Sequence, residues 1–178
     1  MDRARLMAQL AELPLYACEI IGTDALVFSE KVRHICQHEC PMYDTSWACP
    51  PAVGSVEACR ARVTAFREAL VIATVAEVSD IADIRETLDT RAAHEEITRA
   101  ALEIVKRQAS RTLTLSAQAC GICEKCAWPD APCRFPERMF PCVESHGILV
   151  TDLAERCNID FFAGSNVVTW FSLIMYGD

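Results

Sequence analysis

The residues best suited to chemistry in this chain are its cysteines, and most of them are grouped. The densest group, called the Cys120 group here, is Cys120-Gly-Ile-Cys123-Glu-Lys-Cys126, followed after six intervening residues by Cys133. Two residues between cysteines let successive sulfurs converge on one centre, and Gly121 eases the tight turn that this requires. Three such thiols followed by a fourth are typical of ferredoxin-type iron–sulfur runs, although the final ferredoxin gap is shorter.

Zinc is the alternative metal for the Cys120 group, because four thiolates also suit its tetrahedral coordination. Structural zinc sites usually pair two Cys-x-x-Cys turns across a longer gap. Here three cysteines follow one another closely. That succession favours the corners of a 4Fe–4S cluster over a single zinc ion.

A second set, the Cys36 group, consists of Cys36, Cys40 and Cys49. Proline follows both Cys40 and Cys49, and its fixed bend can turn the chain away from a bound group. Cys36 and Cys40 would share one face if this stretch is helical. The spacing is looser than in the Cys120 group, so buried free thiols are the alternative interpretation. The eight-residue gap before Cys49 rules out the three-cysteine pattern of radical enzymes that use S-adenosylmethionine.

The two groups supply seven cysteines, whereas two fully cysteine-ligated 4Fe–4S clusters need eight. An eighth ligand could come from Cys142, Cys157, Cys59 or His38. Alternatively, one cluster keeps an open iron that binds a small ligand, or the chain holds a single cluster. In two-cluster ferredoxins the last cysteine of a run serves the other cluster, so Cys133 could instead complete the Cys36 group.

Three other side chains are weak candidates for catalysis. Glu144 and His146 could act as a general acid–base pair beside an open iron. Arg134 could donate hydrogen bonds to cluster sulfide or to an anionic ligand, or form a surface ion pair. Tyr43 and Trp47 lie between predicted ligands, where they would shield a cluster from water or simply pack.

The composition indicates what class of protein carries these cysteines. The 178 residues carry 11 cysteines, a net charge of -8 and 52% hydrophobic residues, which is typical of a globular protein. The acidity argues against a nucleic-acid partner, since phosphate binding needs clustered Lys and Arg. We find no export signal and no membrane-spanning apolar run, so we expect a cytoplasmic protein that binds metal through these cysteines instead of forming disulfides. We expect a role in redox chemistry or electron transfer with a redox or enzyme partner protein. The alternatives are a binding or accessory module stabilised by zinc or a cluster, and a protein that delivers metal or clusters. Nothing in the sequence sets the oligomeric state.

The apolar pattern predicts one α/β domain over residues 1–178. Its mixed sheet would have about four or five strands, with helices packed on it and two irregular Cys-rich metal-binding loops. We predict strands at residues 16–21, 25–29, 69–78, 111–117 and 167–176, and helices at 1–12, 55–68, 81–105 and 151–157. The apolar phase slips near residues 89–90, so the third helical stretch is either one long helix or two with a break there. His94 is expected to be solvated, because Glu95 and Glu96 follow it.

Several motifs resemble those of a family of Cys-rich predicted metal-binding proteins, known as domain of unknown function 2284 and typical of anaerobic bacteria and archaea. They are Val32-Arg33 before Cys36, Cys40-Pro41-x-Tyr43, Cys49-Pro50-Pro51, Cys120-x-x-Cys123-x-x-Cys126, Pro132-Cys133-Arg134-x-Pro136 and Glu144-x-x-Gly147-Ile148-x-Val150. The resemblance covers roughly residues 17–150. It implies metal or iron–sulfur binding at the matching cysteines and no particular reaction.

The chain departs from that family pattern at two positions. Asp44 stands where glycine is usual, and Cys142 stands where serine is usual. The second change makes Cys142 either an added ligand that is specific to this chain or a buried thiol.

Overall fold

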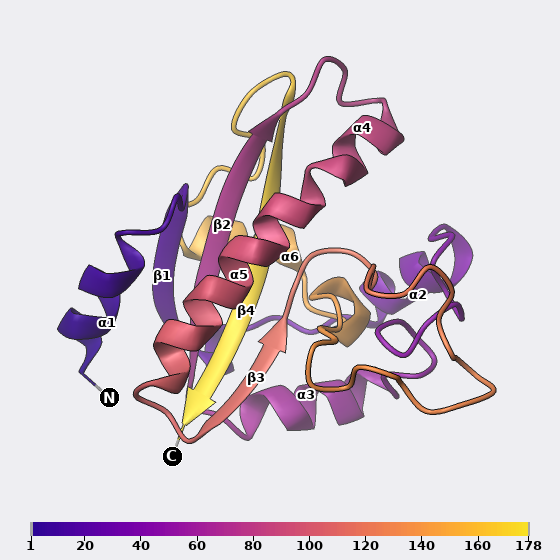
Figure 1. The fold of residues 1–178 in the computed structure, drawn as a ribbon, viewed down its shortest axis with the longest axis horizontal. Helices are drawn as coiled ribbons and strands as arrows, with labels where there is room; N and C mark the ends of the chain where they lie inside the picture. The colour runs from indigo at the N-terminus through magenta and orange to yellow at the C-terminus, as the bar shows by residue number, and fades with distance from the viewer. Residues whose placement is uncertain (1, 178) are drawn as a thin grey trace.

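A four-stranded sheet forms the centre of the computed structural model, which describes residues 2–177 (Figure 1). In spatial order its strands are β1 (Ala17–Gly22), β2 (Glu68–Glu77), β4 (Val167–Gly177) and β3 (Arg111–Leu115). All three strand pairs are antiparallel. The α/β class and the expected number of strands are confirmed.

The prediction of a mixed sheet needs correction. The helical connection from β2 to β3 does return the chain in a parallel direction, as the alternation of strands and helices suggests. However, the C-terminal strand β4 inserts between β2 and β3 and is antiparallel to both. The result is a split β-α-β unit, in which no two named strands of the described chain pair in parallel.

Helices cover both faces of this sheet because β2 is apolar on both sides. Leu70 and Ile72 of β2 pack with α1 (Arg3–Leu10) and α5 (Arg91–Lys106). The alternate residues Val71 and Ala73 pack on the other face with α3 (Val56–Thr64) and α6 (Val150–Arg156). Figure 1 shows α5 lying across β2 and β4 on the near face, with α6 behind them. No helix among residues 2–177 is long and apolar enough to cross a membrane.

The long helical stretch forms two helices, which is one of the two alternatives that the sequence left open. Helix α4 (Ile84–Asp89) ends and α5 begins around Thr90, and Asp83 caps α4 by accepting hydrogen bonds from the backbone amides of Arg85 and Glu86. The predicted helices at residues 55–68 and 151–157 are confirmed as α3 and α6, and the first helix as α1. Residue 1 of that first predicted helix lies outside the described residues.

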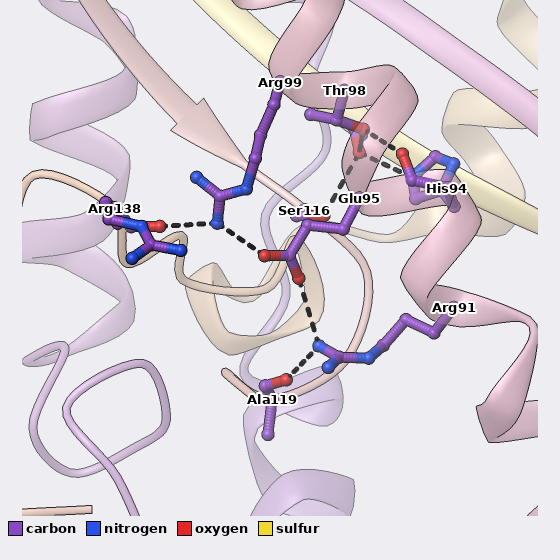
Figure 2. A network of polar contacts seen from close by, with 9 residues as sticks. Arg91, His94, Glu95, Thr98, Arg99, Ser116, Ala119 and Arg138 are labelled. Atoms are coloured by element: carbon purple, nitrogen blue, oxygen red, sulfur yellow. Dashed lines mark hydrogen bonds and ion pairs between the residues drawn. The ribbon is translucent and has the colours of Figure 1, made fainter. Parts of the chain in front are cut away.

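His94 is not solvated, contrary to our expectation. Its side chain is only 1% exposed, and its two ring nitrogens are hydrogen-bonded to Thr74 Oγ1 at 2.8 Å and Ser172 Oγ at 2.6 Å. Thr98, one turn further along α5, also contacts Ser172 Oγ at 2.8 Å (Figure 2). Burial lowers the pKa of His94 to about 4. The adjacent glutamates gave the wrong prediction because helix phase, not neighbouring charge, decides which side chain faces the sheet.

Two further segments differ from expectation. Residues 25–29 do not form a strand; a 3₁₀ turn, η1 (Thr23–Ala25), is followed by an isolated antiparallel bridge between Phe28 and Ile148. The first Cys-rich segment begins as a helix, α2 (Glu30–His38), which Ser29 caps by accepting a hydrogen bond from the Lys31 amide. Beyond α2 this segment is irregular. The second Cys-rich segment is also irregular until the short 3₁₀ turn η2 (Glu144–His146).

Candidate metal centre

The two Cys-rich segments lie on the same side of the molecule, beyond the edge strand β3 (Figure 1). Two tryptophans join them. Trp47 of the first segment donates a hydrogen bond from Nε1 to the Ala131 carbonyl at 3.0 Å, and Trp128 of the second donates to Asp44 Oδ1 at 2.8 Å. The two indole rings meet edge to face with centroids 4.7 Å apart. The segments therefore form one unit, although about 70 residues of chain separate them.

Asp44 adopts a backbone conformation that is uncommon for residues other than glycine. Its φ is +58°, in the left-handed region that glycine adopts most easily and that Asn and Asp tolerate best among other residues. The aspartate keeps this backbone shape and adds the carboxylate that accepts the Trp128 hydrogen bond.

The Cys120 group is brought together as its spacing predicts. Cys120, Cys123, Cys126 and Cys133 are all partly buried and line one small cavity of about 20 Å³, the Cys120 cavity. Burial raises the pKa of Cys120, and the nearby Cys133 and Cys123 thiols add to that shift. Cys133 therefore lies with its own run, and the alternative in which it completes the Cys36 group finds no support in this arrangement.

A second cavity, the Cys36 cavity, has a volume of about 180 Å³. It is lined by Cys36, Cys40 and Cys49, and also by Cys142. Sequence spacing alone left Cys142 as one of several candidates for an eighth ligand. The structure places it at the same cavity as the Cys36 group, so each of the two cavities has four cysteines in its wall.

The other candidates for an eighth ligand lie elsewhere. Cys59 is fully buried, with its sulfur 3.1 Å from Nη2 of Arg62. Cys157 packs in the core beneath the sheet. The His38 ring stacks against His34 on α2. None of these three side chains lines either cysteine cavity.

The Cys36 cavity disfavours bare thiolates. Burial raises the pKa of Cys36 to about 11, and the neighbouring Cys40 and Glu144 add to that shift. Burial also raises the pKa of Cys142 well above its usual value, with further contributions from Glu144 and Cys49. These thiols are protonated at neutral pH until a cation replaces their protons, which is the expected behaviour of soft-metal ligands.

The two cavities are neighbours. Burial raises the pKa of Cys49, and the thiols that contribute to this shift include Cys120 and Cys126 from the other group. Ser46 lies close enough to Cys49 to lower the pKa of that thiol, and it also lines the Cys120 cavity. The Ser46 side chain is buried, and apart from this contact with Cys49 its hydroxyl has no hydrogen-bond partner within residues 2–177. A buried hydroxyl beside thiols is suited to donate to a sulfur of a bound group.

Helix α5 fixes both ends of the Cys120 group (Figure 2). Arg91 donates from Nη1 to the Ala119 carbonyl at 2.5 Å, just before the group, and Arg99 donates from Nη2 to the Arg138 carbonyl at 2.7 Å, just after it. Glu95 lies between the two arginines and pairs with both, at 3.3 Å and 2.5 Å. We call this arrangement the Arg91–Glu95–Arg99 bridge.

Gly121 has a different role from the one its spacing suggests. A Cβ at this position would lie 2.2 Å from Nη2 of Arg91. Glycine therefore leaves room for the guanidinium of the bridge in its present position, which a larger residue would displace, and the turn itself does not need an unusual φ here.

The three catalytic candidates are not brought together. Glu144 lines the Cys36 cavity, and burial raises its pKa. His146 is 1% exposed and contacts Ser145 Oγ at 3.1 Å, and it does not line that cavity. Burial lowers the pKa of His146 to about 3. Arg134 lies at the Cys120 cavity and donates to the Lys125 carbonyl at 2.8 Å. The expected Glu144–His146 pair therefore does not face one shared site.

The donor set of both cavities suits soft metals, since thiolates select zinc, copper(I) and iron–sulfur clusters. No three His, Cys, Asp or Glu side chains among residues 2–177 converge on a point that would hold one metal ion. The thiols instead surround cavities, and the larger one has more than ten times the roughly 10–15 Å³ that a water molecule requires.

Comparison with known proteins agrees with the motifs. The model of a family of predicted metal-binding proteins (DUF2284) matches residues 19–176. The chain therefore belongs to this family. Searches of curated proteins and of solved structures found no match.

Proposed function

We propose that this protein binds iron–sulfur clusters of the 4Fe–4S type at its two cysteine cavities and transfers electrons to a partner protein. The observation that carries the proposal is the pair of neighbouring cavities with four cysteines in each wall. A single zinc ion holds four sulfurs at about 2.3 Å and leaves no free space between them. A cavity of about 180 Å³ among four thiols suits a polynuclear cluster better.

The surroundings of the cavities support a redox role. A bound cluster supplies one-electron chemistry, at a potential set by burial and by hydrogen bonds to its sulfurs. Tyr43 lines the Cys36 cavity and Trp47 lines the Cys120 cavity, where both limit the access of water. Ile35 and Phe135 line the respective cavities and are 52% and 40% exposed. These two apolar side chains mark where a partner protein would come close to each cluster.

One observation favours a second function, a zinc-stabilised binding module. The Cys120 cavity measures only about 20 Å³, which is close to the space of a single small occupant. In that case zinc would fix the second Cys-rich segment against the first, and the joined segments would present a surface to a protein partner.

Metal analysis after strictly anaerobic purification tests the proposal and separates the two functions. We expect a brown protein with iron and acid-labile sulfide in equal amounts. Cys123→Ser should lower both, whereas the matched control Cys18→Ser, in β1, should not. A colourless protein with stoichiometric zinc would favour the binding module. A protein with neither metal, before and after reconstitution with iron and sulfide, would refute both functions.

A further inference from the structure

We infer that Cys142 is the fourth ligand of the metal site at the Cys36 cavity, which it completes with Cys36, Cys40 and Cys49. This inference rests on the proposed iron–sulfur function and deepens it. It assigns four thiolates to each of the two sites, so that neither site has an open iron.

The backbone holds Cys142 in a fixed place beside the end of β3. Ser116 donates its amide to the Pro141 carbonyl at 2.9 Å, and the Val143 amide donates to the Ser116 carbonyl at 3.0 Å. These bonds form a parallel bridge between Ser116 and Cys142 that extends the edge of the sheet. The side chain is 8% exposed, and its sulfur accepts a hydrogen bond from the Ser145 amide at 3.2 Å. An amide donor to sulfur stabilises a thiolate more than a thiol.

A separate set of contacts brings the Cys36 group to this position. Arg33 of α2 donates from Nη2 to the Ser145 carbonyl at 2.6 Å, which ties the helix that carries Cys36 to the turn that follows Cys142. The Cys36 thiol lies 3.9 Å from the Glu144 carbonyl in the same turn. Cys36 and Cys142 therefore reach one cavity from two segments that are anchored to each other.

Glu144 is the competing ligand, because its carboxylate also lines the cavity. A carboxylate oxygen is a hard donor, and thiolate is the preferred ligand of iron–sulfur clusters. Cys142 is therefore the better candidate of the two, and it adds a fourth thiolate to the three of the Cys36 group.

The test compares Cys142→Ala and Cys142→Ser with the control Cys157→Ala, which removes another buried thiol that lies in the core and away from both cavities. All proteins are purified and reconstituted anaerobically. Iron and sulfide are counted per chain, and electron paramagnetic resonance spectra are recorded before and after addition of a small external thiol. We expect about eight iron atoms in the unmodified protein and in the control, as two 4Fe–4S clusters require.

For Cys142→Ala we expect a loss of between one and four iron atoms per chain, with either a 3Fe–4S signal or loss of one cluster's signal. We also expect a spectral response to the external thiol that the unmodified protein lacks. Cys142→Ser, which is nearly isosteric, provides the same comparison if the alanine variant does not fold. Full iron content and an unchanged spectrum in both variants would overturn the inference and leave the proposed function standing. Absence of iron from the unmodified protein would instead overturn the proposed function.

Discussion

Replacing Glu95 with glutamine removes the charge that joins the two arginines of the Arg91–Glu95–Arg99 bridge. The lost pairs are partly buried, because the side chains of Arg91, Glu95 and Arg99 are 18%, 17% and 30% exposed. Each arginine keeps its bond to a carbonyl at one end of the Cys120 group. The variant should therefore fold, but with the two ends of the group held less firmly against α5.

The loss of unfolding free energy in Glu95→Gln can be bounded by the contributions of two kinds of ion pair. An exposed pair four residues apart on a helix contributes about 0.3–0.5 kcal/mol, and a hydrogen bond to a charged group contributes about 1.5–3 kcal/mol. Two partly buried pairs should thus contribute about 2 kcal/mol together. For a chain of this length that corresponds to a fall in melting temperature of roughly 4–8 °C.

The assay is thermal unfolding of the metal-loaded protein, together with the rate at which a chelator removes metal. The control is Glu103→Gln on the same helix, whose pair with Lys106 is well exposed and should contribute less than about 1 kcal/mol. We expect Glu95→Gln to release metal faster from the Cys120 group than from the Cys36 cavity. A melting temperature equal to that of the control, or equal acceleration at both sites, would refute the role assigned to the bridge.

Three other changes have defined outcomes. Because the pKa of His94 is lowered in the fold, the unfolded chain binds its proton more tightly, and stability should fall as pH drops from about 6.5 towards 4. His94 should contribute about 2 kcal/mol to the loss between pH 7 and pH 5 in chemical denaturation, and His94→Gln should lose less than the unmodified protein by that amount. Asp44→Asn should keep the melting temperature, since it keeps the left-handed backbone and the acceptor for Trp128. Asp44→Ala should lose about 1–2 kcal/mol, and equal melting of both variants would argue against the bond. Ser46→Ala should lower the reduction potential in a redox titration and Ser46→Thr should not, because only alanine lacks a hydroxyl donor to cluster sulfur.

Local patterns in the sequence predicted most of the elements. The ten-residue apolar strand β2 depends on nearest neighbours and was predicted, whereas the break near Thr90 was one of two alternatives for that stretch. The order of the strands was not, because the insertion of β4 between β2 and β3 depends on pairing between distant segments. The prediction that His94 is solvated was wrong for a related reason. Its environment is set by Thr74 and Ser172 on two strands that are distant in sequence.

The positions of the cysteines also depend partly on local pattern and partly on contacts between distant segments. The Cys120 group is a local pattern, and its spacing sufficed to predict that these four thiols lie close together, as they do in the wall of one cavity. Cys142 lies nine residues after Cys133 in sequence, yet in space it belongs with the Cys36 group. No spacing rule could assign it, since the bridge between Ser116 and Cys142 decides where it lies.

That bridge also bears on how the two sites depend on each other. The chain leaves the sheet at Ser116, passes through the whole Cys120 group and returns to pair beside its starting point at Cys142. The Cys120 group thus lies in a loop that the pairing of Ser116 with Cys142 closes. The backbone bonds that position Cys142 lie at the base of this loop, outside the Cys120 group. Metal at the Cys120 group can therefore order this loop without being needed to place Cys142, the ligand that we propose for the Cys36 cavity. Cys40 and Cys49 differ, because the stretch between them is bound to the loop through Asp44 and Trp47. The proximity of Cys49 to Cys120 and Cys126 places the two sites side by side, as electron transfer between the proposed clusters would require.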